Sequence, residues 1–456
     1  MSETRDGYEQ EGEDPRVGWK DRVRFADRPG GRSFAYRPHD VLTTRADEAL
    51  AVAQRVYPEA GISVGGVIGP FSRLVDVPDP LRLIEELRLA GILARPNHVL
   101  FLHCVCCPPH PASGCAGGYR IGHGHGINPA EINPAEINPA EINPAEINPA
   151  EINPAEINPA EINPNDPRRI TGLRRSSARP ATPSEEEAED LGLRICAPAA
   201  GGAPKVFVLD TGLAGIDPPH MLAQAPAITG APADAPDVDG NSLLDPGAGH
   251  GTFIAGVINQ VAPGCSVVVH QVATSYGDVD EHTASEFILS LPTDDHTILS
   301  LSFGGAVMDD DALELAWAIR NFQDRGGVVV ASAGNDASCL PSYPAALPGV
   351  IGVGALGTWG PAPFTNYGPW VRACAPGVGL LSLFFEGFDG MPGTDADDFA
   401  GWAYWSGTSF AGPVVVGALA RMMMAAPCNA AQAVTRVIDA PVLLRIPNLG
   451  TVVNVI

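Results

Sequence analysis

The sequence predicts an α/β protein in which a parallel sheet carries helices on both faces and follows a small α+β domain. Over residues 191–456, short continuous apolar runs alternate with stretches of helical spacing, which is the pattern of parallel strands buried on both faces. Over residues 33–104, the apolar pattern follows the order β-α-β-β-α-β of a split-βαβ fold. Residues 105–190 separate the two parts and are too rich in proline and polar residues to build a core.

Length, charge and cysteine content narrow the class of protein. A chain of 456 residues exceeds what a single core usually supports, so two domains and a linker are expected. The formal net charge of −25 argues against nucleic acid or an anionic membrane as a partner. The polar, acidic N-terminus predicts no signal peptide, and no apolar run is long enough to predict a membrane span. The nine cysteines are compatible with a reducing compartment, and the cytoplasm is the expected location.

The N-terminal part is predicted from its apolar spacing. Residues 1–32 are charged and glycine-rich, so we expect them to be disordered. Apolar residues at helical spacing predict helices over residues 46–56 and 81–87. The predicted strands that follow the first helix are 62–68, 71–77 and 98–102.

The linker contains a perfect short repeat. Ile-Asn-Pro-Ala-Glu recurs without interruption from Ile127 to Glu161. A proline at every fifth position excludes a regular helix and a central strand. An extended spacer is the simpler interpretation. A repetitive docking or processing element is the alternative.

Two groups of residues could in principle bind a metal, although we predict no metal site. Asp239, Asn241 and Asp245 lie in a Gly/Asp/Pro loop that is more simply explained as solvated. A denser group of thiols and imidazoles surrounds the start of the linker, and zinc prefers such ligands, but the spacing matches no standard zinc module. Its members are His103, Cys104, Cys106, Cys107, His110, Cys115, His123 and His125.

Three short motifs at turns of the C-terminal domain carry chemistry. Asp210 ends an apolar strand in Val-Leu-Asp-Thr-Gly, His250 opens a helix in Gly-His-Gly-Thr, and Ser409 opens another in Gly-Thr-Ser-Phe-Ala-Gly-Pro. Polar residues at the ends of parallel strands are where such folds place their sites. A serine needs a base within reach and the base needs a carboxylate, so this trio suits nucleophilic acyl transfer. Each residue alone could be a turn or cap residue, but that explanation is weak for all three together.

These motifs, in this order and at this separation, resemble the subtilisin family of serine peptidases. The similarity extends over about residues 203–440 and implies a subtilisin-like domain over residues 191–456. Leu-Ser-Phe-Gly-Gly at 301–305 is similar to the strand that pairs with the substrate backbone. Ala-Ser-Ala-Gly-Asn at 331–335 is similar to the segment that lines the first specificity pocket.

The resemblance also implies a role for each residue. Ser409 is the nucleophile, His250 the general base, and Asp210 the carboxylate that orients the base. The side-chain amide of Asn335 and the backbone N–H of Ser409 would bind the oxyanion. Sedolisins carry a glutamate and a carboxylic acid at the positions of His250 and Asn335, so these two residues exclude them. The substrate-binding residues implied are Ser302, Phe303, Gly304, Ser332, Ala333 and Gly334.

Residues 33–104 resemble the ferredoxin-like propeptide of this family, which inhibits by laying its C-terminal tail in the cleft. The closing strand is expected to continue from Leu102 into the cleft and pair with residues 301–304, with a first cut between His103 and Cys107. Uncharged pocket walls, with Ser342 near the floor, favour small or medium apolar side chains before the cut.

The chain departs from the family pattern in places. Phe253 stands where a second histidine is usual, and no calcium-binding loop fits after Ile258. No calcium or other cofactor is therefore expected.

The sequence leaves two functions open. The first is an endopeptidase that acts on protein or peptide substrates and is held latent by its own prodomain. The second is a binding or scaffold protein that is recruited through the repeats and does not turn over. The complete triad together with Asn335 favours the first, since a scaffold needs none of these residues.

Overall fold

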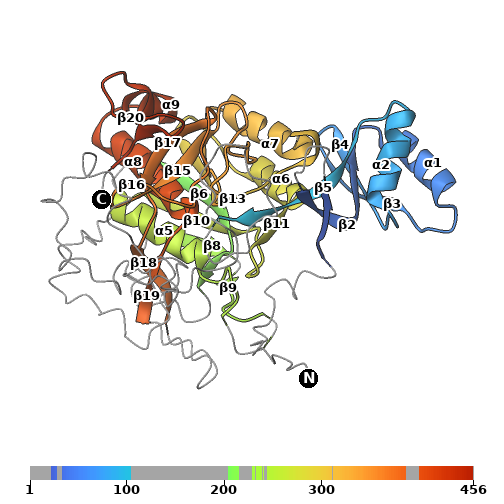
Figure 1. Ribbon diagram of the computed structural model, residues 1–456, viewed down its shortest axis with the longest axis horizontal. Coiled ribbons are helices and arrows are strands. Elements are labelled where there is room, and N and C mark those ends of the chain that lie inside the picture. Colours follow the sequence, from blue (N-terminus) through green and yellow to red (C-terminus); the bar gives the residue numbers. More distant parts are fainter. Residues whose placement is uncertain are drawn as a thin grey trace, which may run out of the picture.

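The described residues of the computed structural model form two domains that share a β-sheet (Figure 1). The larger one contains the parallel sheet that the sequence predicts. The predicted repeat linker and most of the predicted disordered N-terminus lie outside the described residues. The described residues are 22–27, 33–103, 204–214, 228–231, 233–238, 240, 244–310, 312–386 and 400–454.

The small domain has the predicted order of strands and helices. Its elements are β2 (Ser33–Thr43), α1 (Ala46–Val56), β3 (Ser63–Ile68), β4 (Phe71–Val75), α2 (Pro80–Leu89) and β5 (Ala94–Leu102). The strands are ordered β5-β2-β4-β3, and the two helices share an apolar core with the sheet around Leu74, Leu83 and Ile84. Helix α2 begins where Asp79 accepts a hydrogen bond from the backbone N–H of Arg82.

One segment differs from the prediction of disorder over residues 1–32. Residues Arg24–Asp27 form strand β1, which pairs antiparallel with the start of β2. The ring of Phe25 stacks on Phe101 with 6.2 Å between centroids, and Val23 is buried. The sequence prediction was wrong for these residues because their order comes from contacts with distant parts of the chain, which local composition does not reveal.

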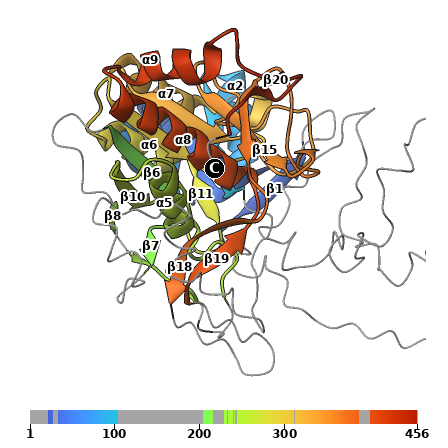
Figure 2. The same ribbon diagram turned by 90° about the vertical axis from the view of Figure 1, so that its left-hand side faces the viewer.

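The large domain is built on a sheet whose central strands are all parallel. In spatial order the parallel strands are β21 (Gly450–Val452), β17 (Val371–Pro376), β15 (Ile351–Gly357), β14 (Val328–Ser332), β12 (Thr297–Leu301), β6 (Lys205–Asp210), β10 (Ser266–Gln271) and β8 (Ile228–Ala231). Two pairs of helices cover the two faces, α5 with α8 and α6 with α7 (Figure 2). These helices are α5 (His250–Val261), α6 (Glu281–Ser290), α7 (Leu313–Asp324) and α8 (Thr408–Ala425).

Short elements complete the described part of this domain. The hairpin of β18 (Leu380–Glu386) and β19 (Ala400–Trp405) contacts α5, and β7 (Leu213–Ala214) pairs with β9 (Ala233–Asp234). The other short elements are β11 (Asp278–Asp280), β13 (Phe303–Gly304), β16 (Gly360–Pro361), β20 (Arg445–Ile446), α9 (Ala430–Val434), η2 (Met308–Asp310) and η3 (Thr435–Asp439).

Strand β5 joins the two domains. It leaves the small domain and runs antiparallel between β11 and β13 of the large domain (Figure 1). Charge pairs reinforce the contact, since Arg37 lies 2.9 Å from Asp278 and 3.4 Å from Asp280. Burial raises the pKa of the Asp280 carboxyl, but Arg37 and hydrogen bonds from Thr283 and Asn97 outweigh it, so the pKa lies below its ordinary value.

A buried carboxylate, Glu281, also links the domains. Its Oε1 accepts the backbone N–H groups of Glu314 and Leu315, which caps the start of α7. Its Oε2 lies 2.6 Å from Nδ1 of His98 on β5. Because Met308 N–H donates to the other ring nitrogen of His98, Nδ1 carries the proton and donates to Glu281.

One helix of the described residues, α8, is long and apolar enough to cross a membrane by length and composition alone. In the molecule 78% of that stretch is buried, as in a helix that packs inside a core. Three cysteines, Cys265, Cys374 and Cys428, are free and buried. Cys339 is disulfide-bonded.

Candidate active site

The three motif residues meet at the edge where the parallel strands end. Asp210 is the last residue of β6, His250 is the first residue of α5, and Ser409 is the second residue of α8. All three side chains are fully buried. The N-terminus of α5 is tightly constructed, because Gly249 has φ +79° and a Cβ there would lie 2.2 Å from the Phe384 ring.

The carboxylate and the imidazole form a direct contact. His250 Nδ1 lies 2.7 Å from Asp210 Oδ1, which also accepts the backbone N–H of Thr211 at 2.8 Å. The imidazole is further held by aromatic rings, with centroids 5.4 Å away for Trp405 and 5.2 Å for Phe410. This environment fixes the tautomer in which Nε2 is free to accept a proton.

The hydroxyl is not yet engaged with the imidazole. Ser409 Oγ donates to the backbone carbonyl of Ser302 at 3.0 Å, and His250 Nε2 has no hydrogen-bond partner among the described residues. Proton transfer between these two side chains would require the Ser409 hydroxyl to leave the Ser302 carbonyl. Such bonds are often incomplete in structures without a reacting substrate.

Two hydrogen-bond donors converge on one carbonyl oxygen. Asn335 Nδ2 lies 2.6 Å from the carbonyl oxygen of His103, and the backbone N–H of Ser409 donates to the same oxygen at 3.1 Å. The amide of Asn335 is oriented by Thr408, whose backbone N–H and hydroxyl both donate to its Oδ1. This pair of donors is the arrangement that stabilises an oxyanion.

The predicted substrate-binding segments lie on both sides of this carbonyl. Phe303 and Gly304 pair with Leu102 and Phe101, and the backbone N–H of His103 donates to the carbonyl of Ser302 at 3.0 Å. The predicted pairing of the closing strand with residues 301–304 is therefore present for residues 302–304.

The second predicted substrate-binding segment, residues 332–334, has side chains in two different environments. Ser332 Oγ lies 2.7 Å from His103 Nδ1. A Cβ at Gly334 would lie 3.6 Å from Cε1 of the same ring. Ala333 instead packs in a separate apolar cluster with Val371 and Cys374.

Sequence reasoning missed one buried acid beside the triad. Asp234 Oδ2 accepts the hydroxyl of Thr211 and the backbone N–H of Gly249, each at 2.7 Å, while its Oδ1 has no partner among the described residues. It thus ties the turn after Asp210 to the start of α5. Burial, and to a lesser degree the Asp210 charge, raises the pKa of Asp234 to about 8 against the opposing effect of these hydrogen bonds. No motif surrounds Asp234, so only its position in the fold identifies it.

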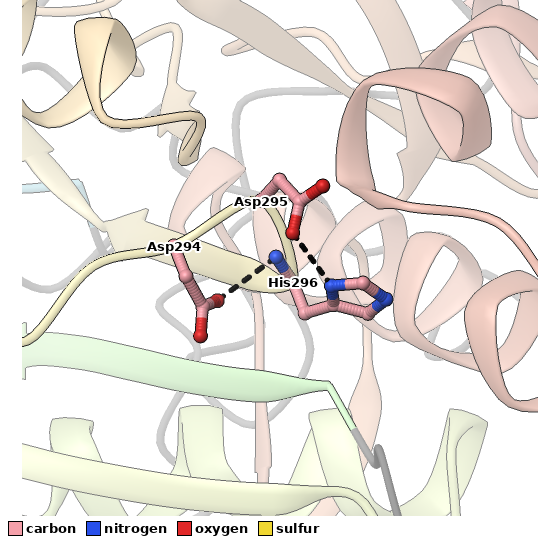
Figure 3. A group of neighbouring side chains, drawn as sticks. All are labelled: Asp294, Asp295 and His296. Carbon is pink, nitrogen blue, oxygen red and sulfur yellow. Dashed lines mark hydrogen bonds and ion pairs between the residues drawn. The ribbon is translucent and has the colours of Figure 1, made fainter.

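The candidate metal ligands that lie among the described residues are held by hydrogen bonds to their neighbours. Asp294, Asp295 and His296 lie close together (Figure 3), but they are largely exposed, and Asp295 already bonds to the His296 ring. Asp294 accepts the backbone N–H of His296, so the group stabilises the turn before β12. Asp245, from the predicted loop, accepts the hydroxyl of Ser275 and the N–H of Val238. The Cys/His group beyond His103 lies outside the described residues.

The chain is similar in sequence to known proteins. A family model described as the subtilase family matches residues 201–438. The chain is 30% identical over 224 residues to a thermophilic serine proteinase of Bacillus sp. (strain AK1), covering 47% of this chain and 50% of that protein. It is 28% identical over 234 residues to thermitase of Thermoactinomyces vulgaris, covering 48% of this chain and 74% of thermitase. The chain thus spans half the length of the first relative.

A solved structure supports the fold. The crystal structure of fervidolysin from Fervidobacterium pennivorans, described as a keratinolytic enzyme related to subtilisin, aligns with a TM-score of 0.55 at 18% identity. The alignment covers 94% of this chain and 61% of that chain. At this level of identity the similarity bears on the fold alone.

We expect Asp234→Asn to change how the free energy of unfolding depends on pH. A carboxyl with a pKa of about 8 in the folded chain and about 3.9 in the unfolded chain binds its proton more tightly when folded. Its contribution therefore lowers stability progressively as pH rises from about 4 to 8. The neutral amide removes this contribution.

Denaturant unfolding at pH 5 and pH 8, in a Ser409→Ala background that lacks the serine hydroxyl, measures this effect. The stability of the Asn variant relative to the parent should rise between the two pH values. Parallel losses in both proteins would contradict a buried neutral carboxyl.

Proposed function

Since the chain belongs to the subtilase family, we propose that it is a serine endopeptidase that cleaves protein or peptide substrates through Asp210, His250 and Ser409. The observation that carries this proposal is the position of the His103 carbonyl oxygen, within hydrogen-bond distance of both Asn335 Nδ2 and Ser409 N. A substrate carbonyl at this position would be next to the nucleophile and ready to develop negative charge. The proposed chemistry needs no cofactor.

The proposed reaction proceeds by acyl transfer. Ser409 Oγ rotates from Ser302 toward His250, gives its proton to Nε2 and attacks the carbonyl carbon of the scissile bond. Asp210 holds the imidazole and stabilises its cation, while Asn335 and the Ser409 N–H bind the oxyanion. The C–N bond then breaks, and the leaving amine takes the proton from His250. Water repeats the sequence on the acyl-enzyme and restores the Ser409 hydroxyl.

The proposal extends to latency. Residues 33–103 would act as an inhibitory prodomain, because β5 occupies the position at which a substrate strand pairs with β13 and β11. The bond between His103 and Cys104 would be the first to be cut, within the range expected from the sequence. The charge pairs of Arg37 with Asp278 and Asp280 would then hold the prodomain in place after cleavage.

Ser409→Ala should abolish covalent labelling by a fluorophosphonate and cleavage of the chain by itself, because both require the hydroxyl. In-gel fluorescence and intact mass measure the two effects on the full chain. Labelling of the parent protein at Ser409, with none in the variant, is the expected result. A parent protein that is folded but never labels would favour the scaffold interpretation instead.

Asn335→Ala should lower peptide turnover by roughly 10²–10³, the loss measured when the equivalent donor is removed from a subtilisin. The alanine also loses the acceptor for Thr408, so Asn335→Asp is the matched variant. The aspartate keeps that acceptor but replaces the donor amide with a carboxylate oxygen, and it should be impaired at least as much. Steady-state kinetics on a fluorogenic peptide gives the comparison. Unchanged turnover in either variant would contradict the oxyanion role.

Arg37→Ala should make the full chain less latent. The variant loses two ion pairs between the proposed prodomain and the large domain, so β5 should leave the cleft more often and Ser409 should label faster. Arg55→Ala is the control, since Arg55 is exposed on α1 and, within the described part of the chain, its guanidinium donates to Ala51 of the same helix alone. Equal labelling rates in the two variants would argue against latency through this contact.

A further inference from the structure

We propose that the first specificity pocket of this peptidase selects a histidine side chain, in substrates whose second and fourth residues before the cut are apolar. This inference rests on the proposed function, because it describes the substrate of the same site. It starts from His103, the residue whose carbonyl oxygen lies between Asn335 and Ser409. The side chain of that residue must occupy the first specificity pocket.

The pocket receives the imidazole through a hydrogen bond. His103 is 8% exposed, and its Nδ1 lies 2.7 Å from Oγ of Ser332, which is itself 1% exposed. A hydroxyl can donate to or accept from a neutral imidazole without burying a charge. The sequence predicted an apolar side chain in this pocket because its walls carry no charge. The Ser332 hydroxyl makes one wall polar.

The walls leave room for a planar ring. A Cβ at Gly304 would lie 2.7 Å from Cε1 of His103 and 2.7 Å from the carbonyl oxygen of Tyr343, so glycine at this position leaves space beside the imidazole. The same Cβ would lie 3.1 Å from Ser342 Oγ, which places that hydroxyl in the neighbourhood of the pocket as the sequence suggested. A Cβ at Gly334 would lie 3.6 Å from the same Cε1, so Gly334 is next to the ring.

Competing side chains fit this pocket less well. Leucine or phenylalanine would bury the Ser332 hydroxyl without a partner, and a site built to hydrogen-bond a group rejects analogues that lack it. Lysine or arginine would bring a charge against the walls at Ser332, Gly304 and Gly334, which carry none. A neutral histidine gives the Ser332 hydroxyl a hydrogen-bond partner without burying a charge.

The rest of the bound strand defines the neighbouring positions. Leu102 and Leu100, the second and fourth residues before the cut, are buried in the core of the large domain. Phe101, between them, stacks on Phe25 of strand β1, which precedes the small domain in the same chain, and so carries no information about external substrates. The predicted substrate class is thus an apolar segment that ends in histidine.

Self-cleavage of the full chain tests the inference, because the bond after residue 103 is already in the site. Intact mass over time gives the cleavage rate for the parent and for His103→Leu, His103→Phe and His103→Lys. Each substitution should slow cleavage at this bond by about tenfold or more. Ser332→Ala should slow the parent by about 3- to 10-fold but should not slow the His103→Leu chain further.

Controls separate failure of this inference from failure of the proposed function. Ser338→Ala removes another buried serine hydroxyl, one that accepts from the N–H of Leu340 in a nearby loop, and should leave the ratio of the parent rate to the His103→Leu rate unchanged. Fluorophosphonate labelling of every variant reports whether Ser409 is competent. Labelling with equal cleavage of the parent and all three His103 variants would overturn the histidine preference. So would a Ser332→Ala substitution that slows the parent and the His103→Leu chain alike. The absence of labelling and cleavage in the parent would instead overturn the peptidase proposal.

Discussion

The antiparallel ladder between β5 and its two neighbours is the constraint on which the site depends. The register that sets Leu102 opposite Phe303 leaves His103 one residue beyond the ladder, where its carbonyl meets Asn335 and Ser409. A slip by one residue would turn every side chain to the opposite face and withdraw the carbonyl from both donors. The proposed latency, the proposed scissile bond and the histidine pocket all follow from this single register.

The large domain provides the rigid frame for that ladder. The end of β6 and the beginnings of α5 and α8 bring Asp210, His250 and Ser409 together from three distant parts of the chain. Asp234 adds a tie between the first two of these elements, since it bonds to the turn after β6 and to the backbone before α5. The catalytic geometry is therefore held by buried hydrogen bonds as well as by the packing of the sheet.

The sequence was informative where function demands particular residues at the ends of regular elements. The three motifs, the parallel sheet and the closing strand could be predicted because strand periodicity and turn residues leave a local signal. Strand β1 could not, since its order depends on Phe101, far along the chain. Asp234 carries no motif, and the hydroxyl of Ser332 points at the imidazole only because of the strand register. Such features arise from tertiary contacts, which a single sequence does not encode locally.

The carboxylates beneath the small domain make its attachment to the large domain depend on ionic strength. Asp278 is completely covered while Arg22 and Arg37 lie against it, and Asp280 and Glu281 follow after Val279 in the chain. If the small domain departs, these neighbouring carboxylates become hydrated and repel one another, and the released arginines are drawn back to them over several ångströms. Dissolved salt screens this attraction over about 8–10 Å. Under the latency proposed above, a chain cut after His103 would stay closed in dilute buffer and open more readily in concentrated salt.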